Sequence, residues 1–296
     1  MTSFMSLAGT AMLALGAAVL VPPMEEADEA VRQGEQCARI EGDAGVAACR
    51  KAIELGYFDR GLNFPASPEA YMRLGKALGE LGRWEEACRP YREIIRLNPE
   101  NAEAHYLLGW VLLEKLDRHE EALGPFLEAL RFRSDYPEAH AGLGLAYVGI
   151  GREEDAILAF RKAIGLQPGN HDAHYGLALS LAKLGQHENA IQSYLSAIRL
   201  DPVDAASHLG VGLSLAKLHR YEAAIASYRQ AIRIEPSLAE AYGNLGVALN
   251  ALGRYQEAVT ALEEAERLDR GYFVRQPRHR LILDASRRRK RWVTEP

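Results

Sequence analysis

Four histidines recur at a nearly constant interval and are the first residues to consider for chemistry. His105, His140, His174 and His208 are separated by 35, 34 and 34 residues. Imidazole binds zinc and transfers protons near neutral pH, so a metal or proton-relay ladder is one interpretation. Zinc, however, needs its ligand nitrogens at about 2.0–2.1 Å, whereas packed helices lie about 8–10 Å apart. We therefore expect these histidines to pack within the fold, and we predict no metal and no other cofactor.

Three cysteines, Cys37, Cys49 and Cys88, offer a second kind of chemistry. Cys37 and Cys49 flank a turn at residues 41–43, where two antiparallel helices could bring them within disulfide reach, provided that their Cα atoms lie within about 7 Å. The alternative is a pair of buried thiols that pack as small apolar side chains. The spacing leaves both interpretations open, and we expect Cys88 to be packed.

The sequence contains no G-x-G-x-x-G or P-loop string and no G-x-S-x-G motif. We therefore predict that the protein is not an enzyme. The net charge of −5 argues against a general nucleic-acid partner, although nine basic residues and only two acidic ones follow from Arg270 onward. Binding of an anionic surface or a nucleic acid through this basic tail is the alternative function.

A series of regularly spaced alanines, called the alanine ladder below, indicates the architecture that positions these residues. Six of them are separated by 35, 34, 34, 34 and 34 residues: Ala87, Ala122, Ala156, Ala190, Ala224 and Ala258. A fixed period of this length is typical of a stacked array of repeats, each too small to bury its own apolar face. An aromatic ladder runs in phase with it, at Tyr91, Phe126, Phe160, Tyr194 and Tyr228.

These ladders resemble the tetratricopeptide repeat (TPR) family over residues 68–272. One unit reads Tyr71, Leu74-Gly75, Ala87, Tyr91 and Pro99, which is the family's order of residues. The resemblance implies an all-α, right-handed superhelical solenoid of helix-turn-helix repeats. We expect six clear repeats over 68–272, a degenerate repeat over 25–67, and a capping helix with a basic tail over 273–296.

Within a repeat, glycine recurs inside the first helix, where it costs about 1 kcal/mol relative to alanine. Such a cost at one phase predicts close approach between helices. Glycines at the turn between the two helices are expected to be left-handed. The capping helix, with Leu281, Ile282 and Leu283, is expected to cover the last repeat with its apolar side.

Residues 1–24 are predicted to be a signal peptide or a membrane anchor, because no charged residue occurs from Phe4 to Val21. Membrane association would run through residues 4–21, and the protein would be exported, periplasmic or anchored facing outside the cytoplasm. The alternative is a cytoplasmic protein whose apolar helix folds onto the array. The chain also resembles exported bacterial TPR proteins with a cysteine pair around the first hairpin, which implies a Cys37–Cys49 disulfide.

The family resemblance further implies that the first helices line a concave groove. The groove residues predicted here are Tyr106, Trp110, Leu113, Leu145, Tyr175, Leu179, Lys183, Leu209, Leu213 and Lys217. The aromatic side chains would anchor a protein or peptide partner, and the lysines would select acidic flanks. The predicted function is therefore a non-enzymatic scaffold or adaptor, with an accessory subunit of a cell-envelope enzyme complex as an alternative. The oligomeric state is not predicted.

Overall fold

The computed structural model describes residues 29, 32–33, 35–37, 41–55 and 68–294, and these contain helices and no strand. The chain divides into two compact units, Met1–Leu97 and Asn98–Pro296. The helices of the first unit are α2 (Gly42–Glu54), α3 (Pro68–Glu80) and α4 (Trp84–Leu97). The segment predicted as a signal peptide or anchor, residues 1–24, lies outside the described residues, as does much of the predicted degenerate repeat.

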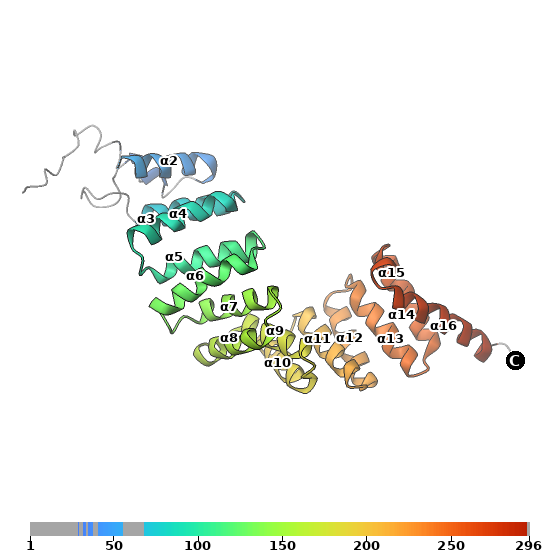
Figure 1. Cartoon of the computed structure of the whole chain (residues 1–296). Coiled ribbons are helices and arrows are strands. Elements are labelled where there is room, and N and C mark those ends of the chain that lie inside the picture. The colour runs from blue at the N-terminus through green and yellow to red at the C-terminus, as the bar shows by residue number, and fades with distance from the viewer. Residues whose placement is uncertain (1–28, 30–31, 34, 38–40, 56–67, 295–296) are drawn as a thin grey trace, which may run out of the picture. The chain divides into compact units, whose positions relative to one another are not determined.

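The second unit is a succession of helical hairpins followed by two further helices (Figure 1). The hairpins pair α5 (Ala102–Trp110), which continues as η1 (Val111–Lys115), with α6 (His119–Phe132); α7 (Pro137–Gly149) with α8 (Glu153–Leu166); α9 (His171–Lys183) with α10 (His187–Leu200); α11 (Ala205–Lys217) with α12 (Tyr221–Ile234); and α13 (Ala239–Ala251) with α14 (Tyr255–Leu268). Each second helix also packs against the first helix of the following hairpin. The predicted all-α solenoid of helix-turn-helix repeats is confirmed.

The ladder residues hold neighbouring helices together. All six ladder alanines have no exposed surface. The ring of Phe160 lies between two first helices: a Cβ added at Gly144 would lie 2.7 Å from this ring, and one added at Gly176 would lie 2.4 Å from it. Phe126 has the same relation to Gly109 and Gly142, at 3.0 and 2.6 Å. The predicted close approach is confirmed, because no side chain fits at these glycines.

The turns inside the hairpins also follow from sequence. The predicted turn glycines have a left-handed backbone with φ between 70° and 75°: Gly82, Gly151, Gly185 and Gly253. Asp117 and His219 hold the same conformation in the two hairpins that lack the glycine, with φ of 55° and 59°. This conformation ends the first helix and starts the second.

The one repeat with an extra residue accommodates it as a π-helix. The alanine spacing is 35 rather than 34 residues between Ala87 and Ala122. In this repeat α5 changes into η1 over Val111–Lys115, and the Leu116 amide donates to the carbonyl of Val111. A single π-helical turn of this kind, here called the π-turn, widens the helix locally without breaking the array. Such turns occur often at functional sites.

The array ends with α15 (Tyr272–Arg275) and α16 (Pro277–Thr294), and α16 packs against α13 and α14. Leu283 is buried, and Ser286 Oγ donates to Asn250 Oδ1 at 2.9 Å. The expectation for Leu281 was wrong, because its side chain is 68% exposed. Helix positions two residues apart face different directions, so Leu281 and Leu283 do not share the covering side.

Candidate functional site

The histidine ladder has a repeated structural role. In each case Nε2 lies against the backbone carbonyl oxygen six residues earlier: Pro99 for His105, Ser134 for His140, Pro168 for His174 and Pro202 for His208, at 2.9, 3.0, 3.0 and 3.4 Å. The Nε2–H tautomer donates to this carbonyl and ties the first helix to the turn before it. No cluster of three metal-ligating side chains occurs within the described part of the chain.

Some of the predicted groove residues lie at a cavity of about 280 Å³ between α5, η1, α7 and the start of α9, which we call the α5–α7 cavity. Its lining comprises Tyr106, Trp110, Leu113, Glu114, Glu138, Ala141, Gly142, Leu145, Asn170 and Asp172. Four of the predicted residues therefore lie together here: Tyr106, Trp110, Leu113 and Leu145. Trp110 is the last residue of α5 and Leu113 lies within η1, so the π-turn forms part of the cavity wall.

Aromatic packing fixes one side of this cavity. The ring centroid of Tyr106 lies 4.9 Å from that of Tyr136 and 6.1 Å from that of Phe126. Burial raises the pKa of Tyr106, and the nearby carboxylates of Glu138 and Glu114 raise it further. The Tyr106 hydroxyl therefore stays protonated and can donate a hydrogen bond to a ligand.

Carboxylates are the part of the cavity that the sequence analysis missed. Glu114, Glu138 and Asp172 line it and are exposed, and none of its lining residues is basic. A signal was present in the sequence, because acids recur at the second position of the first helices: Glu69, Glu103, Glu138, Asp172 and Glu240. This position also lies in the first helical turn, where the helix dipole favours acids in any protein.

Farther along the first helices, the predicted groove residues differ in exposure. Tyr175 is half-buried, with its ring edge-on to Tyr194 at a centroid distance of 5.8 Å. Leu179 and Leu213 are also half-buried. Leu209 is only 8% exposed and belongs to the core beside α12 and α13, so it offers no surface to a partner. Leu113 is 5% exposed and contributes to the cavity wall rather than to an open face.

The two groove lysines also differ. Lys183 Nζ lies 2.9 Å from Glu153 Oε1, and the side chain of Glu153 is only 11% exposed. This ion pair compensates a carboxylate that burial would otherwise penalise, so Lys183 has a structural task. Lys217 is exposed, and within the described residues it has no ion-pair partner. The expected pair of lysines selecting acidic flanks is thus reduced to Lys217.

A larger cavity, of about 850 Å³, lies in the first unit between α2, α3 and α4. Its lining mixes both signs of charge, and Arg50 pairs with Glu86 at 2.9 Å across it. Two arginines and four glutamates line this cavity, so ion pairs compensate part of its negative charge.

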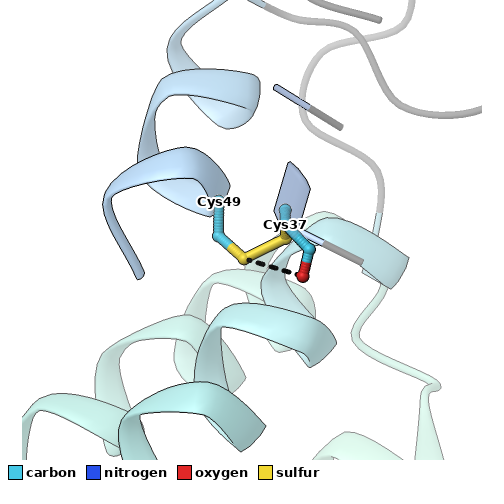
Figure 2. Close-up of a disulfide and its surroundings, with 2 residues drawn as sticks. All are labelled: Cys37 and Cys49. Carbon is cyan, nitrogen blue, oxygen red and sulfur yellow. Dashed lines mark hydrogen bonds between the residues drawn. A yellow bond between two sulfur atoms is a disulfide. The ribbon is translucent and has the colours of Figure 1, made fainter. Parts of the chain in front are cut away.

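Cys37 and Cys49 form a disulfide in the first unit, with their Cα atoms 4.6 Å apart (Figure 2). Cys49 belongs to α2, and Cys37 lies in the helical residues 35–37. Cys49 Sγ also lies 3.8 Å from the Cys37 carbonyl oxygen, but a half-cystine has no proton to donate, so this is a packing contact. Cys88 is buried and is not part of a disulfide.

The basic C-terminal segment is partly neutralised by ion pairs. Arg287 lies 2.7 Å from Glu263 of α14, and Arg275 pairs with Asp269 at the end of that helix. Arg280 lies 3.6 Å from Asp284, which belongs to α16 itself. These ion pairs leave less of the segment's charge for an anionic partner. Among the described residues, no helix combines the length and apolar character needed to cross a membrane.

Family models for repeats match most of the chain from residue 72 to residue 272. A tetratricopeptide repeat model matches residues 72–137 and 141–205, a TPR repeat model matches 212–253, and a second tetratricopeptide repeat model matches 239–272. No curated protein matches the sequence.

Solved structures share the fold. YrrB, described as a TPR protein with an unusual peptide-binding site, is 25% identical with a TM-score of 0.56, over 67% of this chain and 97% of its own. MamA is 25% identical with a TM-score of 0.53, over 58% of this chain and 94% of its own. PilF of Pseudomonas aeruginosa is 20% identical with a TM-score of 0.60, over 71% of this chain and 97% of its own, a likeness of fold alone.

Proposed function

The chain belongs to the tetratricopeptide repeat family, and we propose that it is a non-enzymatic scaffold that binds a peptide segment of a partner protein along its first helices. Arrays of this family are typically protein-interaction scaffolds without catalytic activity. The observation that carries the proposal is the α5–α7 cavity, where Tyr106, Trp110 and Leu145 meet on the face predicted to bind. YrrB, which shares this fold, is itself a peptide-binding TPR protein.

The cavity suits an anchoring side chain. Aromatic residues dominate interface energies because they bury a large area at little cost in conformational entropy. Tyr106 is held by its neighbours Tyr136 and Phe126, so its position is set before a ligand arrives. A preformed site of this kind loses little free energy to ordering when it binds.

The test is the affinity of the full chain for a peptide selected from a random library. Trp110→Ala should weaken binding at least tenfold, since central aromatic residues contribute about 2 kcal/mol or more. Leu158→Ala is the matched control, because this apolar residue lies on the second helix α8 and is 65% exposed. Equal loss in both variants, or loss in neither, would exclude the first-helix face as the binding site.

We also propose that the protein works outside the cytoplasm, either exported or anchored. The disulfide between Cys37 and Cys49 supports this address, because disulfides persist in oxidising compartments and are rare in the cytosol. Cell fractionation combined with thiol labelling tests it. We expect the two cysteines to resist labelling until a reductant is added, in a fraction outside the cytoplasm. Freely labelled cysteines in a cytosolic fraction would contradict the proposal.

A further inference from the structure

The carboxylates of the α5–α7 cavity are only partly compensated by the side chains around them. Glu114 and Glu138 are exposed and have no ion-pair partner within the described residues. Asp172 Oδ1 lies 3.1 Å from His171 Nδ1, and His171 Nε2 lies 3.2 Å from Asp204 Oδ2. His171 thus contacts the carboxylates of both Asp172 and Asp204. The cavity therefore keeps a negative charge even when His171 is protonated.

Two cationic side chains of this region contact aromatic rings. Lys115 Nζ lies 4.9 Å from the centroid of the Trp110 ring, and the Arg133 guanidinium lies 3.2 Å from that of Tyr136. Neither residue lines the cavity. Both contacts nevertheless show that the aromatic residues of this region already accept cations on their faces.

The negative charge continues along the first helices beyond the cavity. Burial raises the pKa of Tyr175, and the carboxylates of Asp204 and Glu240 raise it further, so both acids act on this ring. Asp172 and Glu240 also belong to the row of acids at the second helical position. A ligand that extends from Tyr106 toward Tyr175 therefore meets carboxylates at several points.

We propose that the ligand of the first-helix face is a basic peptide segment, with a Lys or Arg side chain in the α5–α7 cavity and apolar residues beside it. The inference rests on the proposed function and specifies its partner. Glu114, Glu138 and Asp172 offer oxygen acceptors to a guanidinium or ammonium group, and Tyr106 and Trp110 offer ring faces to its alkyl chain. The charge proposed for the ligand is opposite to the acidic character that the groove lysines led us to expect.

Other cationic or charged ligands fit less well. No group of three acidic, histidine or cysteine side chains in the described residues could hold a metal ion. A nucleic acid would bring phosphates against three carboxylates, and like charges at close range oppose binding. A peptide cation satisfies both the acids and the aromatic residues.

The first experiment is selection of a random peptide library on the immobilised full chain, with Trp110→Ala protein as counter-target. The inference is supported if peptides rich in Lys and Arg are enriched on the unmodified protein and are not enriched on the Trp110→Ala protein. Enrichment of acidic or uncharged peptides that still depends on Trp110 would overturn the inference while the proposed function stands. If no peptide depends on Trp110, the proposed function fails and the inference fails with it.

The second experiment removes charge without changing shape, in the variant Glu114→Gln/Glu138→Gln/Asp172→Asn. Affinity for a selected basic peptide should fall about tenfold, because three partly exposed charge pairs are lost. The control Glu154→Gln/Glu222→Gln/Glu235→Gln removes three exposed acids that have no ion pair in the described residues.

Two of these control acids lie in the first turns of the second helices α8 and α12, which matches the helix-dipole effect of the test variant. The control should bind as the unmodified protein does, with the same circular dichroism in all three proteins. Equal weakening in the test and control variants would show attraction by net charge alone and would overturn the assignment to the cavity.

Discussion

The array is stacked by aromatic rings that enter the space left by glycine, so a single methyl group at Gly176 should destabilise it. An added Cβ would lie 2.4 Å from Phe160 Cζ, about 1 Å inside ordinary van der Waals contact. The ring is fully buried and has little room to move away, because a Cβ at Gly144 on its other side would lie only 2.7 Å from it. Overpacking of this kind costs about 1–3 kcal/mol.

Intrinsic helix propensity acts in the opposite direction, because alanine is better than glycine by about 1 kcal/mol inside a helix. We expect Gly176→Ala to be destabilised by a net of about 1–2 kcal/mol, since Phe160 is confined on both sides. Gly165→Ala is the control on the same helix as Phe160. A Cβ at Gly165 meets no atom within 4 Å, so the free energy of unfolding of this variant should rise by up to about 1 kcal/mol.

The assay is thermal and urea unfolding followed by circular dichroism. A change of 1 kcal/mol corresponds to a shift of about 2–4 °C in the melting temperature of a chain of this size. Hydrogen exchange of α9 would locate the effect, because repeat arrays can unfold in parts. Adding Phe160→Leu to Gly176→Ala removes the outer ring atoms that the new methyl group would contact. The double variant should therefore lose less free energy of unfolding than the two single variants lose in sum. The reasoning is refuted if Gly176→Ala raises the midpoint as Gly165→Ala does.

Three further changes probe the fold. Ala190→Leu should cost about 1–3 kcal/mol in unfolding experiments, because Ala190 has no exposed surface, whereas an unchanged midpoint would show that the helices separate easily. Reducing Cys37–Cys49 should destabilise the first unit by about 2–3 kcal/mol and leave peptide affinity unchanged; a loss of affinity would contradict the placement of the site. Burial lowers the pKa of His279, whose Nδ1 accepts from the Tyr272 hydroxyl at 2.7 Å. The contribution of neutral His279 to the stability of the fold is complete above the unfolded pKa of about 6.5 and is lost as pH falls through the folded pKa. The melting temperature of His279→Asn should therefore fall less steeply with acid than that of the unmodified protein.

The repeat architecture was predictable because its causes are local and recur. Ala, Gly and aromatic residues return every 34 residues, and each copy reports the same packing geometry, as Phe160 between Gly144 and Gly176 shows. The turn conformation of Gly151 followed from the same periodicity. Position in a periodic sequence thus fixes which residues meet the next repeat.

The binding face was less predictable because it depends on departures from the repeat. The extra residue was visible as a spacing of 35, but its accommodation as the π-turn η1, which brings Trp110 and Glu114 to one cavity, depends on packing against α6 and α7. The burial of Leu209 and the ion pair of Lys183 depend on neighbouring repeats as well. Sequence phase gives the direction of a side chain and leaves its partners undetermined.

The most direct test of the central claim is site-specific crosslinking of a selected peptide. A photoreactive phenylalanine analogue at Leu145, which lines the α5–α7 cavity, should crosslink to the peptide, and unlabelled peptide should compete. The same analogue at Leu127, which is 47% exposed on the second helix α6, should not. Crosslinking from position 127 with none from position 145 would contradict binding along the first helices.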